Sequence, residues 1–415
     1  MRRSSKAGSH KLSADSQRLA TFAQAIVLAS SRLEERGWES QLDALLQKLL
    51  RGDHQETIDA ALDQLFGSDA NAYDALMEAA EAASESAVIE HDDLLFDALL
   101  LAVPILAWTR FSIPSGPIPA DMLMTLSAHL NAHLPAPNVK FAMAPTLFAI
   151  DQLPRSHVET WTVTQRLAQA ALKGTVLRTP ADVPETAPFL ADTRYLLAVV
   201  VVPAGEPLLR WQATMQLSDR DDALTQWQAQ AMPNIARLLP GCGIELLLPE
   251  AYYVACREGD RQIRPASIRA AVHFLIHTLA VDARDLQASI GSFGEDAGTG
   301  RADEYRIGFS VGDTSDVVYG VVWPLYGEED EEDLSELATL PLQRLAAGEI
   351  PRPTPLEEIT TLLREAGVVR VIRHADRFPM EFCDDCNAPL FPDPDADLVH
   401  AEMPEDIPQG ATHFH

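Results

Sequence analysis

Residues 194–202, Arg-Tyr-Leu-Leu-Ala-Val-Val-Val-Val, constrain the fold more than any other feature of this 415-residue chain. The run is rich in β-branched residues and shows no apolar–polar alternation, which is typical of a strand buried on both faces. A strand of this kind must lie inside a sheet that other elements cover on each side. We therefore expect a sheet in the interior of the protein.

The first part of the chain carries helical patterns instead. From residue 13 onward, apolar residues recur at spacings of three, four and seven, which indicates helices with one buried face. We also predict helices over residues 73–87 and 92–106. The resulting helical segment covers residues 13–104 and follows a mobile basic tail of residues 1–12.

The rest of the chain alternates between helical and extended patterns. We predict helices over residues 120–134, 158–173, 219–239, 265–279 and 356–366. Extended segments are expected at residues 139–150, 208–215, 244–248, 252–257, 286–293, 305–309, 316–323 and 368–372. This order favours an α+β protein with mixed-sheet α/β sandwich units over a strict doubly wound sheet.

The expected organisation beyond the helical segment has four parts. A β-α-β unit with a following helix and a Pro-rich loop covers residues 105–192, and an α+β domain covers residues 193–326. An acidic linker of residues 327–354 then leads to a C-terminal segment of residues 355–415. The acidic run at 327–333 is interpreted as a solvated loop, the usual role of such runs.

Charge and cysteine content limit the partners and the compartment. The chain has 61 acidic and 32 basic side chains, a formal charge of −29, which repels phosphate backbones and anionic lipids. We expect neither nucleic acid nor a membrane as a partner, and instead an unknown protein or small molecule. Four cysteines in a chain this long are too few for a disulfide-stapled secreted domain, so we expect the cytoplasm.

The sharpest chemical feature is the Cys-x-x-Cys pair Cys383 and Cys386. This spacing lets both sulfur atoms face one metal ion across a tight turn. The residue after the second cysteine tends to be left-handed, which Asn387 tolerates better than most residues, and Pro389 fixes the exit of the turn. The segment is typical of one half of a zinc knuckle.

A full structural zinc site needs four ligands, and the chain has no second Cys-x-x-Cys. The candidates for the missing ligands are the histidines of the C-terminal segment: His400, His413 and His415, with His374 in reserve. Two cysteines, His400 and one of the last two histidines would form a closed tetrahedral site. Such a zinc ion would be a structural clip, because no position would be open for water.

Two other interpretations of the cysteine pair stay open. A redox dithiol is one, although Asp384 and Asp385 between the sulfur atoms should disfavour a thiolate, and no thioredoxin-like unit surrounds them. The other is a pair of reduced surface cysteines with incidental histidines.

The remaining candidates are weaker. His273 and His277 share one face of a helix, but they lack the glutamate that a metalloprotease pair carries, so we interpret them as core or edge histidines. Cys242 between two glycines is interpreted as a small buried residue and not as a nucleophile. No phosphate-binding loop, kinase signature or nucleophile elbow is present.

Both ends of the chain resemble an uncharacterised bacterial family classified as a domain of unknown function. The resemblance lies in residues 11–43, in Phe-Cys-Asp-Asp-Cys at 382–386 and in Leu-Val-His-Ala-Glu-Met-Pro at 398–404. It implies a bacterial cytoplasmic origin and brings no activity, cofactor or catalytic residue.

Two main functions are therefore open, beside a third, minor one, a metal-dependent regulator. The first is a non-catalytic adaptor or ligand-sensing protein whose helical segment engages a partner and whose C-terminus holds a structural zinc ion. The second is an enzyme, a hydrolase or transferase, with a site assembled from distant residues of the region 105–325. An enzyme should show a deep pocket there in which titratable groups converge.

Overall fold

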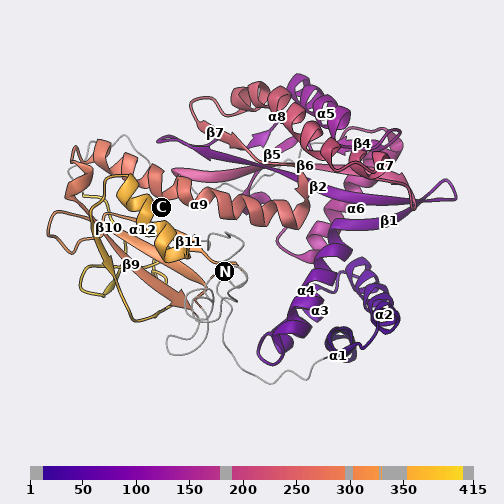
Figure 1. Cartoon of the computed structure of the whole chain (residues 1–415), viewed down its shortest axis with the longest axis horizontal. Coiled ribbons are helices and arrows are strands. Elements are labelled where there is room, and N and C mark those ends of the chain that lie inside the picture. Colours follow the sequence, from indigo (N-terminus) through magenta and orange to yellow (C-terminus); the bar gives the residue numbers. More distant parts are fainter. Residues whose placement is uncertain (1–12, 178–188, 295–301, 327–328, 330–352, 405–415) are drawn as a thin grey trace, which may run out of the picture.

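The structure is a computed structural model that describes residues 13–177, 189–294, 302–326, 329 and 353–404. It is an α+β protein with an N-terminal helical segment, two sheets and a small C-terminal segment (Figure 1). The basic tail at residues 1–12, most of the Pro-rich loop and nearly all of the acidic linker lie outside the described residues. No helix of the described part of the chain is long and apolar enough to cross a membrane.

The helical segment consists of four helices that pack around one leucine- and alanine-rich core. The helices are α1 (Ala14–Leu28), α2 (Arg32–Arg51), α3 (Gln55–Phe66) and α4 (Ala70–Glu85). Side chains of Ser13, Ser31 and Asp69 cap the first, second and fourth helices by accepting a backbone N–H of the first turn. The apolar periodicity of the sequence thus becomes a bundle with one buried face per helix.

The first sheet is built around two long antiparallel strands, β2 and β6, which pair from Phe96 with Pro203 to Trp108 with Ala191. Its described strands are β1 (Ser86–His91), β2 (Leu94–Trp108), β3 (Gly116–Pro117), β4 (Lys140–Met143), β5 (Thr146–Ala149), β6 (Ala191–Pro203), β7 (Gly243–Leu246) and β8 (Glu250–Ala251). Residues 192–202 of β6 are all buried, which confirms the strand buried on both faces.

Helices cover both faces of the first sheet (Figure 1). One face packs against α5 (Ala120–His133) and α8 (Ser218–Leu238). The other face packs against α6 (His157–Lys173) and the beginning of α9 (Tyr252–Thr278). The short helix α7 (Arg210–Thr214) leads into α8.

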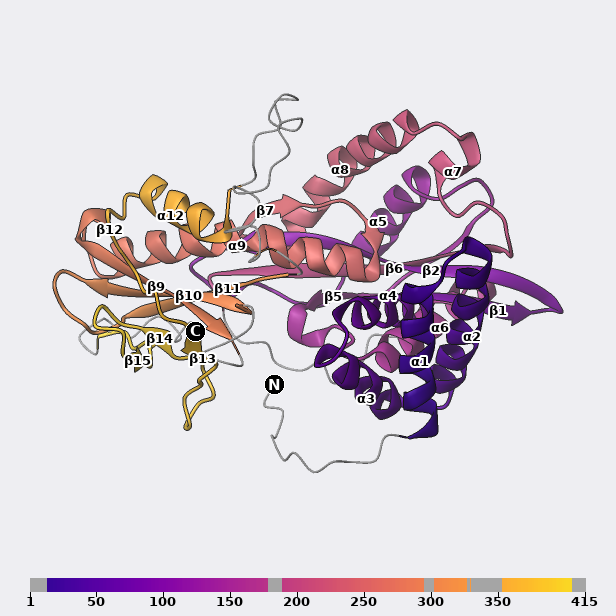
Figure 2. The ribbon, with the colours of Figure 1, turned by 60° about the horizontal axis from the view of Figure 1, so that its bottom comes forward.

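The second sheet has an antiparallel centre, β9–β10–β11, to which two short parallel strands are added. Its described strands are β9 (Leu286–Gly294), β10 (Glu304–Val311), β11 (Tyr319–Pro324), β12 (Arg370–Arg373) and β13 (Phe378–Pro379). One face packs against α9 and α12 (Pro355–Glu365). Figure 2 shows the small hairpin of β14 (Phe391–Pro392) and β15 (Leu398–Val399) on the opposite side of this sheet.

Helix α9 joins the two sheets, because its first half packs on the first sheet and its second half on the second. Pro265 lies inside this helix and cannot donate to the carbonyl of Arg261. The Nε of the buried Arg264 donates to that carbonyl instead, at 3.1 Å. The helix therefore continues through the proline.

Three of the predicted secondary-structure segments are wrong. The segment predicted as a helix over residues 92–106 is strand β2, so the helices end at Glu85 and the expected boundary at 104/105 falls inside a strand. The expected strand at 252–257 is the first part of α9, and the expected strand at 208–215 contains α7. The boundary at 192/193 also falls inside a strand, β6.

Candidate metal centre

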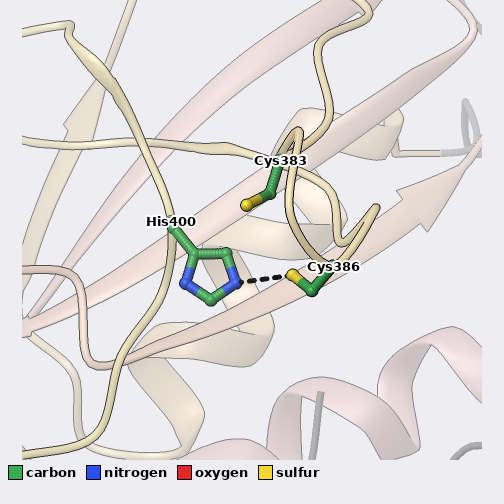
Figure 3. A group of neighbouring side chains, drawn as sticks. All are labelled: Cys383, Cys386 and His400. Atoms are coloured by element: carbon green, nitrogen blue, oxygen red, sulfur yellow. Dashed lines mark hydrogen bonds between the residues drawn. The ribbon is translucent and has the colours of Figure 1, made fainter.

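The structure brings three predicted ligands of the C-terminal segment together. The sulfur atoms of Cys383 and Cys386 and a ring nitrogen of His400 all lie within 4.8 Å of one another (Figure 3). The shortest contact that the structure gives joins Cys386 Sγ and His400 Nε2, at 3.2 Å. Zinc–ligand bonds of about 2.0–2.3 Å place neighbouring tetrahedral ligands roughly 3.5–3.8 Å apart, so one ion fits this group.

A tight hairpin presents the two sulfur atoms. The N–H of Cys383 donates to Ala388 O at 2.8 Å, and the N–H of Asn387 donates to Cys383 O at 2.9 Å. Asn387 has a φ of 59°, the left-handed conformation expected for the residue after the second cysteine. The two arms of the hairpin meet at the bridge between Phe382 and Pro389.

His400 reaches the sulfur atoms because it directly follows β15, which pairs with β14. Its Nδ1 lies 3.2 Å from Glu402 Oε1. When Nδ1 carries the proton and donates to this carboxylate, Nε2 is the unprotonated nitrogen, and its lone pair faces Cys386. A carboxylate behind the imidazole is a common second partner of zinc-bound histidines, because it fixes the tautomer and the ring orientation.

The turn also favours the thiolate form of Cys383. Backbone N–H groups of Cys386 and Asp385 donate toward its sulfur and hold the pKa of Cys383 below its usual range. The negative charge of Asp385 opposes this effect but is the weaker influence. The expected unfavourable effect of the neighbouring charge is thus present for Asp385, but the amide donors outweigh it and the net pKa of Cys383 is lowered.

A buried arginine of the second sheet holds the base of the hairpin. Arg306 on β10 is 0% exposed, and its Nη1 donates to the carbonyls of Glu381 and Leu390, both at 2.7 Å. Its Nε donates to Glu304 at 2.6 Å, and its guanidinium lies over the Phe293 ring. Arg306 thus fixes the strands that enter and leave the cysteine turn.

Two glycines on the same face of the second sheet make room for β14. Gly308 and Gly320 are directly paired across β10 and β11. A Cβ atom at Gly308 would lie 2.5 Å from the carbonyl oxygen of Pro392, and one at Gly320 would overlap the ring of Phe391. Both positions therefore require glycine for the close approach of the C-terminal segment.

Among the described residues, the reserve ligand His374 is not part of this group. His413 and His415 lie outside the described residues and stay predictions. The reserve ligand His374 places its Nε2 2.9 Å from the carbonyl of Asp393, where it supports the β14–β15 turn.

The weaker candidates also have defined surroundings. Cys242 is half-buried and Cys256 is more deeply buried, and burial raises the pKa of both thiols, so neither is an activated nucleophile. His273 and His277 are exposed on α9, with their Nε2 atoms 3.0 Å apart, which agrees with edge histidines.

Sequence reasoning found the three candidate ligands but missed Arg306, Gly308, Gly320 and Glu402. Only Glu402 left a local signal, since it follows His400 by two residues and can lie on the same side of an extended chain. The other three act through sheet register and packing, which no spacing in the sequence reveals.

The chain matches no curated protein and no solved structure. A family model described as "Protein of unknown function (DUF2863)" matches residues 4–414, which is nearly the whole chain and includes the hairpin and its histidine. The chain therefore belongs to this DUF2863 family.

Proposed function

We propose that the C-terminal segment binds one zinc ion through Cys383, Cys386 and His400, and that this ion is structural. The observation that carries the proposal is the convergence of the three ligand atoms within 4.8 Å of one another. They come from two separate pieces of chain, the hairpin at 382–389 and the residue after β15. A bound ion would cross-link these pieces and fix the segment to the second sheet.

The chemistry of the ligands favours zinc. Two thiolates and an imidazole suit zinc, whereas calcium and magnesium select oxygen ligands. The fourth ligand that we propose is His413 or His415, as the sequence suggested. With four protein ligands the ion would have no open position and would not act on a substrate.

The surroundings of the group also favour a structural role. Cys386 is exposed and Cys383 is half-exposed at the tip of the hairpin, and the cavity described below is lined by other residues. Arg306 and the glycine pair hold the hairpin from the sheet side, and the metal would hold it from the outside.

The test is elemental analysis of untagged protein purified under reducing conditions. We expect about one zinc per chain, with loss of nearly all of it in Cys383→Ser and in His400→Gln. Cys242→Ser and His273→Gln are matched controls, because these residues lie outside the group, and they should keep the metal. A chelator should lower the melting temperature of the wild type and leave that of Cys383→Ser unchanged.

Two outcomes would overturn the proposal. Wild-type protein without stoichiometric metal is one, and retention of the metal in both ligand variants is the other. A reversible Cys383–Cys386 disulfide in metal-free protein, found by mass spectrometry, would instead support the redox dithiol.

The broader role that we propose is a non-catalytic adaptor or ligand-sensing protein in the bacterial cytoplasm, where thiols stay reduced. Leu28 and Leu33 flank the α1–α2 turn and are 80% and 81% exposed, which supports a partner-binding role of the helical segment. Crosslinking in a host lysate should capture a partner with the wild-type protein but not with the double variant Leu28→Asp/Leu33→Asp. Equal recovery of the partner with the wild type and the variant would contradict this role. The alternative, an enzyme with its site in 105–325, would require turnover of a substrate.

A further inference from the structure

A cavity of about 970 Å³ lies where α9 passes from the first sheet to the second. Its walls come from the end of β2 and the residues after it, from α9 and from α12. Its apolar side includes Trp108, Phe111, Leu190, Phe274 and Leu362. We call this space the α9 cavity. Its size is at the upper end of the range for small-molecule sites, and its aromatic lining is typical of them.

The charges around the α9 cavity differ from those of the whole chain. The chain has nearly two acidic side chains for each basic one, 61 against 32. The cavity instead has Arg110, Arg269 and two histidines beside only two acids, Glu245 and Glu358. In an otherwise strongly acidic protein, this lining has as many arginines as acids and two histidines as further hydrogen-bonding groups.

The basic groups on α9 form a regular row. Arg269, His273 and His277 follow one another at intervals of four residues, so they lie along one face of the helix, and all three line the cavity. His273 and His277 stand with their Nε2 atoms 3.0 Å apart. One ring can therefore donate to the other, and the pair offers ring nitrogens as hydrogen-bonding groups in the cavity.

The two arginines are available for a ligand. Within the described part of the chain, Arg110 has no ion-pair partner, and its guanidinium lies 5.5 Å from the centre of the Phe111 ring. Among the described residues, the ion-pair contact of Arg269 is a weak one, 3.8 Å from Glu365, with both side chains 60% exposed. In the same described part, neither arginine forms a tight internal pair, in contrast to Arg194 and Arg306.

We propose that the α9 cavity binds an organic anion with an aromatic body and one acidic group, such as a carboxylate, sulfonate or phosphate. The aromatic body lies against Trp108, Phe111 and Phe274, and the acidic group is bound by Arg110, Arg269 and the histidine row. The site shares no residue with the C-terminal metal group, so it does not depend on the proposed zinc function.

The test compares two fluorescent probes with the same type of ring system. Anilinonaphthalene sulfonate carries an acidic group, and phenylnaphthylamine is its uncharged counterpart. We expect the full-length protein to bind the sulfonate about tenfold or more tightly than the neutral probe, with one site per chain. The double variant Arg110→Gln/Arg269→Gln should remove this preference and bind the neutral probe as the wild type does.

Two further variants keep the test decisive. Arg237→Gln removes an exposed arginine of α8 outside the cavity and should leave both affinities unchanged. Ala266→Trp places a large ring in the cavity and should lower the binding affinity of both probes by about fivefold or more. Circular dichroism establishes that each variant is folded.

The proposal is overturned if the sulfonate does not bind. It is also overturned if the sulfonate binds no better than the neutral probe, or if the arginine double variant keeps the wild-type preference. Binding that Ala266→Trp leaves unchanged would place the probe on another surface and would overturn the proposal too.

Discussion

The first and second sheets differ in what covers their faces. Long helices cover both faces of the first sheet, and the strands β2 and β6 bring almost only apolar side chains to them. The second sheet has one face of this kind, under α9 and α12. Its other face carries Ser289, Gly291, Arg306, Gly308 and Ser310, and a C-terminal segment with two-residue strands covers it.

Each sheet contains a buried arginine, and the two arginines differ in the backbone segment that they bind. Arg194 on β6 and Arg306 on β10 are 2% and 0% exposed, and each forms an ion pair with the acid two residues earlier, Asp192 and Glu304. Each also donates to two backbone carbonyls outside its own sheet. Arg194 fixes the loop after β2, whereas Arg306 fixes the arms of the cysteine turn. A buried arginine that pairs with an acid and donates to two backbone carbonyls therefore supports packing in the first sheet and a candidate metal site on the second.

The largest expected effect comes from replacing each arginine with methionine. Arg306→Met and Arg194→Met each remove the ion-pair partner of a buried carboxylate and the donor to two backbone carbonyls, so each should lower the free energy of unfolding by about 3–5 kcal/mol. Only Arg306→Met should also weaken zinc binding, by about tenfold or more, because it frees the arms of the hairpin. Urea denaturation and a competitive zinc titration measure the two quantities.

Equal zinc affinity in these two variants would contradict the proposed difference between the two arginines, since it would show that Arg306 only stabilises the sheet. Arg306→Lys is the useful intermediate. It keeps the charge but cannot reproduce the geometry of the guanidinium, so its zinc affinity should fall between those of the wild type and Arg306→Met.

The second prediction concerns the glycine that admits β14. In Gly308→Val the new side chain would meet the backbone oxygen of Pro392, which cannot move without displacing the C-terminal segment. We expect a loss of about 3 kcal/mol in the free energy of unfolding and a lower zinc affinity. Ser310→Ala is the control on the same face of β10. Its buried hydroxyl has no hydrogen-bond partner within the described part of the chain, so its removal should change little. Unaltered zinc binding in Gly308→Val would contradict the close docking of β14.

The third prediction concerns the joint between the sheets. Asp260 on α9 accepts from Tyr195 of the first sheet at 3.3 Å and from Tyr326, after β11, at 3.2 Å. Burial raises the pKa of Asp260 to about 6, although both hydroxyl donors oppose the shift. The folded protein therefore holds this proton more tightly than the unfolded chain. The resulting stabilisation is complete below pH 3.8 and is lost as the pH rises through 6.

Asp260→Asn should remove this pH dependence. The free energy of unfolding of Asp260→Asn minus that of the protein with Asp260 should increase by about 2 kcal/mol from pH 4 to pH 8, because only the latter loses stability over this range. Urea denaturation at both pH values measures this difference, in a Cys383→Ser background so that metal binding does not contribute. A constant difference between the two proteins would mean that folding does not raise the pKa of Asp260.

The sequence predicted the class of fold but not the path of every segment, and β2 shows why. Its Leu- and Ala-rich residues are strong helix formers, so local propensity favours a helix. Pairing with β6 over residues 96–108 overrides that propensity, and Pro104 in the middle was a local sign against a helix. At 252–257 the error is the reverse, because Tyr-Tyr-Val favours a strand, and Pro265 suggested that a helix starts there.

The candidate site divides in the same way. The spacing of Cys383 and Cys386 and the left-handed Asn387 depend on a few neighbouring residues, and the sequence predicted both. The place of Arg306 beneath the hairpin depends on the register of β10 and on the packing of a segment about 75 residues further along the chain. Local patterns therefore identify the candidate metal ligands, whereas only the assembled sheet shows what positions them.

The smallest effect is expected at Asn387. It distinguishes the cysteine turn from a turn of the first sheet that has the same backbone conformation. Asn387, in the cysteine turn, and Asp93, in the β1–β2 turn of the first sheet, both have a φ of 59°. Alanine at either position would be strained and should lower the free energy of unfolding by about 1 kcal/mol, whereas glycine should cost little. Only Asn387→Ala should also lower zinc affinity, by about fivefold, because the unbound turn would leave the conformation in which both sulfur atoms face the ion. Competitive titration of the four variants measures this effect. A similar loss in Asp93→Ala would show that zinc affinity follows global stability and not the shape of this turn.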